Sequence, residues 1–246
     1  MTKGNSGLSE QVLNKAIEAG LSTQLDAAEK LEANVQTDPV ALLQGELRSA
    51  GIEGQGLVMK RDLRTEKLSM QTDGVAIDPL KAAFGDIELT RPTNATAVVT
   101  LTEADIQRAF NGDYIHQKLQ NLKVQSDGQP TQVNVQHVEF KLPGEGKVAI
   151  AADVTNSATG EVQHLAFSAT PEVGPQGHQV LLSQVQVEGQ GAPAALTNSL
   201  LAAASALLDL RNFALPGMLL SLQTIDIQTG KMLLQAQAQV KDFPGN

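Results

Sequence analysis

Histidines and carboxylates are the side chains of this chain that could carry catalysis or hold a metal. The chain has four histidines, His116, His137, His164 and His178. The last three fall on predicted strands, which folding could bring together, but scattered strand histidines are far more often surface or core residues than metal ligands. Carboxylate pairs such as Glu188 and Asp226 could also meet across strands. With 27 acidic residues some proximity arises by chance, and nothing marks a catalytic pair.

Motifs for nucleophilic catalysis, nucleotide binding and zinc hydrolysis are all absent. The sequence contains no G-x-S-x-G elbow, no G-x-x-x-x-G-K-[ST] loop, no G-x-G-x-x-G fingerprint and no H-E-x-x-H pair. It also contains no cysteine, which excludes disulfides, thiol catalysis and Cys-ligated zinc. We therefore expect no catalytic residue, no metal and no cofactor. A lipid hydrolase is the least favoured hypothesis for the function, because the chain contains no recognisable nucleophile.

One short segment gathers positive charge in an acidic chain. The cations Lys60, Arg61, Arg64 and Lys67 lie within eight residues, offset only by Asp62 and Glu66. Each cation near an anionic leaflet contributes about 1 kcal/mol of binding, so the cluster could contact lipid headgroups or a membrane. The alternative reading is a solvated turn between two strands.

Composition places the chain among globular proteins. Its 246 residues are 41% hydrophobic and 18% charged, and only 3% are aromatic, so the core must be built from Leu, Val, Ile and Ala. The net charge of -9 repels a phosphate backbone, which excludes nucleic acid as a partner. The most apolar run, 200–208, is far shorter than the roughly 20 residues of a spanning helix. With no secretory signal, we expect a cytoplasmic protein, compatible with peripheral attachment to the inner face of a membrane.

The N-terminal residues have helical periodicity. Apolar residues recur at spacings of four to six, close to those of an amphipathic helix over 8–31: Leu8, Val12, Ile17, Leu21, Leu25 and Leu31. Asp38 and Pro39 then supply an N-cap and a first-turn proline for a short helix through Leu47, ended by the glycines at 51, 54 and 56. We expect residues 1–44 to form an N-terminal helical segment and residues 45–246 to form one α+β domain.

From Leu57 the apolar period changes to two, the spacing of a strand, and Val75 and Ile77 resume one step out of phase, which predicts a β-bulge before them. Residues 121–188 contain runs bounded by turn clusters and predict a meander of about five antiparallel strands. The apolar phase slips between Val135 and Val138 and again between Leu182 and Val185, which predicts β-bulges and a bent sheet. Thr102 and Asp105 have the spacing of a capping box and predict the start of a short helix.

The C-terminal part predicts a helix and a hairpin. Residues 193–211 are rich in Ala and Leu, and their leucines surround much of the circumference, so this helix should be buried. Residues 220–227 and 232–240 predict the two arms of the hairpin. Facing aliphatic residues of a strand and of this helix could line a site for acyl chains: Val185, Val187, Leu196, Leu200, Leu201 and Leu207. Alternatively, these residues pack in an ordinary filled core.

Four stretches of the chain resemble a known family. They are PLKAAFGDIEL (79–89), TLTEADIQRAF (100–110), LLDLRNF (207–213) and LPGM (215–218). Together they are similar to the LmeA-like phospholipid-binding family in its cyanobacterial version. The resemblance covers about residues 45–240 and does not include the N-terminal helical segment, which we also call the helical lead. It implies a non-catalytic lipid-binding domain, and it brings no catalytic residues to carry over.

The fold that this resemblance implies, by analogy with tubular lipid-binding proteins, agrees with the pattern of bulges. We expect an α+β fold in which a long, strongly curved antiparallel sheet wraps around a buried helix, preceded by an N-terminal amphipathic helical lead. The expected function is to bind phospholipid or another lipid at or near a membrane surface, with acyl chains between the sheet and helix 194–210. The alternative is a membrane-associated scaffold with a filled core and no lipid. The identity of the lipid, the pathway and the oligomeric state stay open.

Overall fold

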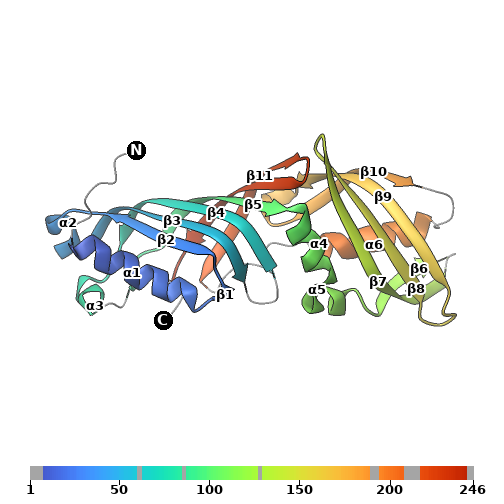
Figure 1. Ribbon diagram of the computed structural model, residues 1–246, viewed down its shortest axis with the longest axis horizontal. Helices are drawn as coiled ribbons and strands as arrows, with labels where there is room; N and C mark the ends of the chain where they lie inside the picture. The colour runs from blue at the N-terminus through green and yellow to red at the C-terminus, as the bar shows by residue number, and fades with distance from the viewer. Residues whose placement is uncertain are drawn as a thin grey trace.

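Two antiparallel sheets lie end to end in an elongated molecule (Figure 1). The computed structural model describes residues 8–59, 63–84, 87–126, 129–188, 194–207 and 217–242. The larger sheet has the strand order β1-β3-β4-β5-β12-β11, and β2 also pairs with β3. Its strands are β1 (Leu25–Ala27), β2 (Lys30–Gln36), β3 (Glu46–Met59), β4 (Leu63–Ala76), β5 (Thr93–Thr102), β11 (Met218–Gln228) and β12 (Lys231–Val240). The predicted C-terminal hairpin is thus confirmed as β11 and β12.

The smaller sheet is the meander expected over residues 121–188. Its five strands are β6 (Leu122–Ser126), β7 (Gln129–Gly144), β8 (Lys147–Asn156), β9 (Val162–Val173) and β10 (Val180–Glu188), paired in the order β10-β9-β8-β7-β6. Register shifts lie between Val135 and His137 in β7 and between Ser183 and Gln186 in β10. The two bulges predicted from the slipped apolar phase are therefore confirmed, and the α+β class with a strongly curved antiparallel sheet is confirmed as well.

Six helices, among the described residues, cover the sheets and their junction: α1 (Leu8–Ser22), α2 (Pro39–Leu43), α3 (Pro79–Ala83), α4 (Glu103–Asn111), α5 (Asp113–Lys118) and α6 (Ala194–Leu207). Figure 1 shows α1 along the larger sheet, α2 and α3 at its outer end, α4 and α5 at the junction, and α6 beside the smaller sheet. A 3-10 turn, η1 (Pro175–Gly177), precedes β10. Within the described parts of the chain, no helix combines the length and hydrophobicity needed to cross a membrane.

The N-terminal helix is shorter than its leucine spacing predicts. It ends at Ser22, and Leu25 and Leu31 belong to strands β1 and β2. In β2 the side chains of Ala33 and Val35 are buried while their neighbours are exposed, which is the period of a strand. The prediction of a continuous helix to residue 31 is wrong because leucines spaced by four to six residues also fit a helix followed by two strands.

The glycines near residue 50 do not end a helix. The second helix ends at Leu43, and Gly51, Gly54 and Gly56 lie inside β3. Later, in β4, the apolar phase changes without any register shift against β3, so the bulge predicted there is wrong. Gly74, with φ of +72°, produces the change instead, because this left-handed conformation turns the next side chain to the other face.

Candidate functional site

Helix α1 closes the outer edge of β2 with a stripe of polar side chains. Strand β2 pairs only with β3 among the described strands, so its other edge presents backbone N–H groups without a strand partner. Three side chains at four-residue spacing accept hydrogen bonds from these groups: Glu10 from Thr37 at 3.1 Å, Asn14 from Val35 at 2.8 Å and Glu18 from Ala33 at 3.1 Å. Leu13 and Ile17, on the neighbouring face, are buried in the core. The helix therefore forms part of the wall.

Helix α4 closes an edge of the smaller sheet in the same way. Strand β6 covers only the first part of β7, and the edge beyond it faces α4. Again three side chains at four-residue spacing accept backbone hydrogen bonds: Glu103 from Leu142 at 2.7 Å, Gln107 from Phe140 at 2.6 Å and Asn111 from Val138 at 3.2 Å. The predicted capping box at Thr102 and Asp105 begins this helix and is confirmed. Each curved sheet thus has a helix attached to one of its edges through backbone hydrogen bonds.

The walls enclose an apolar cavity of about 450 Å³. Its lining begins at α1 and β3, continues along β4, β5, β12 and β11, and reaches β9, β10 and α6 of the other half. Strand register places lining residues in rows across the larger sheet, one of which is Ile52, Met70, Ala97, Ala236 and Leu222. The cavity therefore extends from one sheet to the other, and its volume lies within the roughly 300–1,000 Å³ of ordinary ligand sites.

Side chains in the middle of the larger sheet show that its interior is hollow. Leu68, Val99 and Leu234 lie next to one another on the central strands β4, β5 and β12 and line the cavity. In a filled core such positions would be fully buried, yet all three are only partly buried, as is Ala236. Since neighbouring strands cover them on both sides, their accessible surface faces the cavity.

The charged side chains in the described lining are Arg64 and Asp105. The Arg64 guanidinium donates to Asp105 at 2.8 Å, to Glu66 at 2.9 Å and to Glu29 at 2.9 Å. The second carboxylate oxygen of Asp105 accepts from the Thr102 hydroxyl at 2.6 Å and from the Thr102 backbone N–H at 3.1 Å. This ion-pair network joins β4 to the start of α4, at the junction of the two sheets.

Hydrogen bonds set the charge state of this network. Burial of Asp105, whose side chain is 2% exposed, would raise its pKa, but hydrogen bonds from Thr102 and Arg64 outweigh burial and hold the pKa below its usual range. The hydrogen bonds that Arg64 gives to Asp105, Glu29 and Glu66 raise the pKa of the guanidinium. Both groups are therefore charged and satisfied by protein partners, and they give the cavity no free charge.

The structure separates the members of the predicted basic cluster. Lys60 and Arg61 lie outside the described residues. Arg64 is in the cavity wall with its side chain only 18% exposed, and Lys67 is exposed on β4 opposite Gln55 and Thr100. Headgroup contact by this segment stays a prediction.

The predicted acyl-chain residues lie around the smaller sheet and α6. Leu196 is buried, Leu200 packs beside it, and Val185 and Leu201 pack on a second cluster that includes Phe140. Val187 is 49% exposed, and the side chain of Leu207 lies outside the described residues. The described lining of the cavity includes none of these residues; nearby, Val180 and Leu182 of β10 and Ala204 of α6 line it instead. Lipid contact by the predicted set stays a prediction.

Sequence reasoning missed most of the cavity wall. The inward residues of β4, β5, β11 and β12 alternate with polar ones, and this alternation was available as a signal, for example in Leu234 and Ala236 beside Gln235 and Gln237. Alternation shows which face is apolar, but it does not show whether that face meets protein or empty space. The curvature of the sheet decides this.

Comparison with known proteins gives one family. A family model described as LmeA-like phospholipid-binding matches residues 4–237. No curated protein and no solved structure gives a significant match. The match begins far before residue 45, so the expectation that the helical lead lies outside the resemblance is wrong. Helix α1, which lies within the match, shares the core with β2 and β3.

Proposed function

Because this chain belongs to the LmeA-like phospholipid-binding family, we propose that it binds phospholipid without catalysis and holds the acyl chains in the apolar cavity, acting at or near a membrane surface. The observation that carries the proposal is the cavity itself. It is about 450 Å³ in volume, and its described lining is almost entirely apolar and mostly aliphatic. Aliphatic walls suit acyl chains, because Leu, Val, Ile and Met adapt their rotamers to a flexible ligand.

An empty cavity of this size would be a large cost to the fold. At about 24 cal/mol per Å³, the volume of 450 Å³ corresponds to a loss on the order of 10 kcal/mol relative to a filled interior. That is comparable with the roughly 5–15 kcal/mol by which proteins are stable. An apolar ligand recovers this energy. The cavity therefore favours lipid binding over the alternative of a scaffold with a filled core.

The polar headgroup is proposed to stay outside the cavity. Arg64 and Asp105 satisfy each other and their neighbours, so a buried phosphate would find no free cation in the described lining. Burying an unpaired charge costs several kcal/mol, which no contact with the aliphatic wall offsets. Selection among lipids should therefore depend on the acyl chains more than on the headgroup. Val185, Leu196, Leu200 and the other predicted residues remain proposed as further acyl contacts.

Monomeric short-chain phospholipids test the proposal without a membrane. Lengthening both chains of a phosphatidylcholine by one carbon should tighten binding roughly ten-fold, because each buried methylene contributes about 0.8 kcal/mol. A phosphatidylglycerol with the same chains should bind with similar affinity. Titration calorimetry measures both series, and native mass spectrometry of the purified protein shows whether phospholipid co-purifies. Affinity that does not change with chain length, together with no co-purifying lipid, would reject the proposal.

A further inference from the structure

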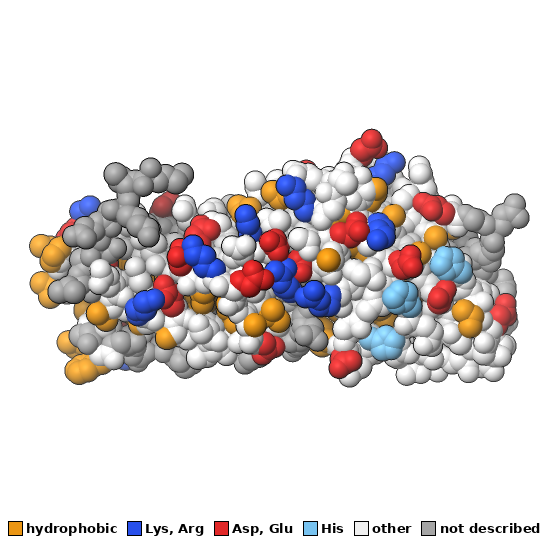
Figure 2. All heavy atoms as spheres, in the orientation of Figure 1, with side chains coloured by type: hydrophobic (Ala, Val, Ile, Leu, Met, Phe, Trp, Pro, Cys, Tyr) orange, Lys and Arg blue, Asp and Glu red, His pale blue; other side chains and the backbone are white. Residues whose placement is uncertain are grey.

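Two short helices form an exposed apolar end on the larger sheet. Helix α2 precedes β3 and α3 follows β4, and because Glu46 pairs with Ala76 both helices lie at the same end of the larger sheet. Their large apolar side chains are among the most exposed in the described structure: Val40 at 64%, Leu43 at 81%, Leu80 at 75% and Phe84, the C-cap of α3, at 92%. Figure 2 shows hydrophobic side chains gathered at this left-hand end. We call Val40, Leu43, Leu80 and Phe84 the apolar tip.

Neither helix needs large apolar side chains at the tip positions in order to fold. Each helix begins with an Asp-Pro pair, and the Asp side chain accepts hydrogen bonds from two backbone N–H groups of the first turn. Each also has its own inward contact, Leu42 in α2 and Ala82 in α3, packed on the core. The tip residues point outward from helices that are already capped and anchored. Folding therefore gives no reason for four large apolar side chains in water.

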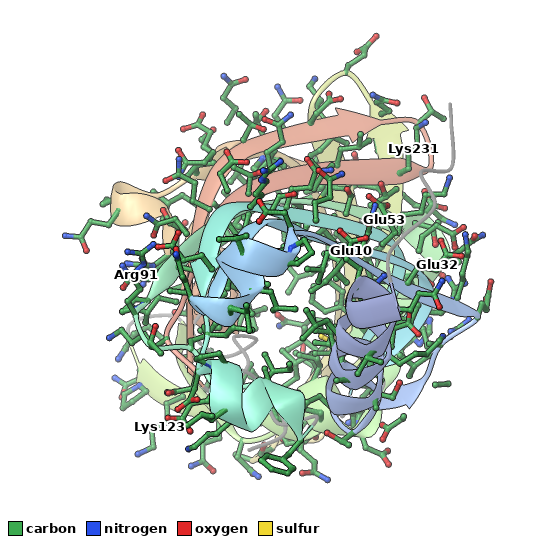
Figure 3. The ribbon with its side chains drawn as sticks, turned by 90° about the vertical axis from the view of Figure 1, so that its left-hand side faces the viewer. Glu10, Glu32, Glu53, Arg91, Lys123 and Lys231 are labelled. Atoms are coloured by element: carbon green, nitrogen blue, oxygen red, sulfur yellow. The ribbon has the colours of Figure 1, made fainter. Side chains whose placement is uncertain are left out.

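The apolar tip lies at the end of the cavity. Leu47, Ile77 and Ile87, which follow α2 or flank α3, line the cavity behind the tip. Figure 3 looks along the molecule from this end, with α1, α2 and α3 around the interior and the labelled Glu32 and Arg91 directed outward. A surface that contacts the tip is therefore adjacent to the cavity.

The charge around the apolar tip indicates what kind of surface contacts it. Segments 38–48 and 78–91 contain three Lys or Arg against five Asp or Glu, a net charge of −2. Arg48 pairs with Asp38 at 2.7 Å, and Lys81 pairs with Glu88. Attraction to an anionic leaflet is therefore not available here. A standard protein interface needs roughly 20–30 residues on each side, whereas a bilayer accepts a few protruding apolar side chains without a matched shape.

We propose that the apolar tip inserts into the interfacial region of a lipid bilayer, binding neutral lipid as well as anionic lipid and placing the adjacent end of the cavity against the acyl chains. This rests on the proposed function, since it names the end of the molecule at which phospholipid would be exchanged. Insertion transfers side chains that are exposed in solution, so it requires no conformational change of the core.

Flotation with vesicles of phosphatidylcholine alone tests the insertion. The double variant Leu43→Ser, Phe84→Ser should bind these vesicles at least 100-fold more weakly than wild type, because each inserted side chain contributes roughly ten-fold or more. The matched control Val12→Ser, Val162→Ser removes two apolar side chains that are 59% and 60% exposed elsewhere, and it should bind like wild type. Both variants should unfold at the wild-type temperature, since the replaced side chains are in water.

A single-tryptophan probe tests the same contact without loss of apolar surface. The chain contains no Trp, so Phe84→Trp and Val162→Trp each give one reporter. Phosphatidylcholine vesicles should shift the emission of Phe84→Trp to shorter wavelength and leave Val162→Trp unchanged. Equal flotation of the tip variant and wild type, or a shift in neither reporter, would overturn the proposal. Self-association of wild type without vesicles, abolished in the tip variant, would assign the tip to a second copy and overturn it as well.

Short-chain phosphatidylcholine separates this proposal from the function on which it rests. As a monomer it reaches the cavity without a bilayer, so the tip variant should bind it as wild type does. If wild type binds the short-chain lipid and the tip variant still floats normally, only the insertion is wrong. If neither protein binds the short-chain lipid, the proposed cavity function fails.

Discussion

Replacing Ala236 by leucine tests directly whether the interior is hollow. Ala236 lies on β12 between Ala97 of β5 and Leu222 of β11, on the row of side chains that lines the cavity. It is only partly buried although strands flank it on both sides. A larger side chain at this position should therefore extend into the cavity.

The sign of the effect distinguishes the two states of the interior. Leucine adds three carbon atoms, and their burial in an empty cavity should raise the free energy of unfolding by up to about 2.4 kcal/mol, at about 0.8 kcal/mol for each carbon. In a filled core the same change would lower it by about 1–3 kcal/mol, because the added atoms force neighbours out of position. The two outcomes thus differ by about 3–5 kcal/mol.

Urea unfolding of delipidated protein measures this difference. The matched control is Ala169→Leu on β9, because Ala169 is 1% exposed, lies opposite Val148 in a packed cluster and is not part of the described cavity lining. We expect Ala169→Leu to lower the free energy of unfolding and Ala236→Leu to raise it. If acyl chains bind in the cavity as proposed, Ala236→Leu should bind less phospholipid than wild type, since leucine occupies part of that space. Equal destabilisation by both substitutions would refute a hollow interior.

Two further predictions concern the walls of the cavity. Asp105→Asn should lower the free energy of unfolding by about 1–3 kcal/mol at pH 7, because it removes the carboxylate that Arg64 contacts in the cavity wall. The pKa of Asp105 is lowered in the folded protein, so its stabilisation is complete above the ordinary Asp pKa of about 3.9 and is lost as the pH falls from there through the folded value. The difference between wild type and Asp105→Asn in urea unfolding should therefore shrink below about pH 4, and a constant difference would contradict this account. Asn14→Leu leaves the N–H of Val35 without its side-chain acceptor and should cost about 1–3 kcal/mol in the same assay. A change of less than about 0.5 kcal/mol would show that water replaces the amide.

Local patterns in the sequence predicted much of the fold. The capping box at Thr102 and Asp105 and the five strands of 121–188 follow from hydrogen bonding and side-chain periodicity within short segments, and both are confirmed. The end of α1 could not be predicted in this way. Leu25 contacts the chain at Met59, more than thirty residues away, and such pairing is invisible to a helical or strand period read along one segment.

The candidate site was harder to predict because it depends on curvature and on long-range pairing. The sequence identified Arg64 as a cation in a basic cluster, but its carboxylate partners Glu29 and Asp105 are 35 and 41 residues away. Likewise, the polar face of α1 reads as a solvated surface in the sequence. In the structure Asn14 and Glu18 are bound to the edge of β2.

The polar groups of the wall explain how a hollow interior is compatible with a defined fold. A cavity removes packing contacts from the centre of a domain, so the shape must be fixed by the periphery. Here α1 and α4 each satisfy three backbone N–H groups on a sheet edge, which would otherwise be open to pairing with another chain. The network of Arg64 and Asp105 connects β4 of the larger sheet to α4, the helix that is bound to the edge of the smaller sheet. Since these polar atoms are paired within the wall, the interior surface stays apolar, and the acyl chains of the proposed ligand would enter or leave it without breaking a hydrogen bond of the protein.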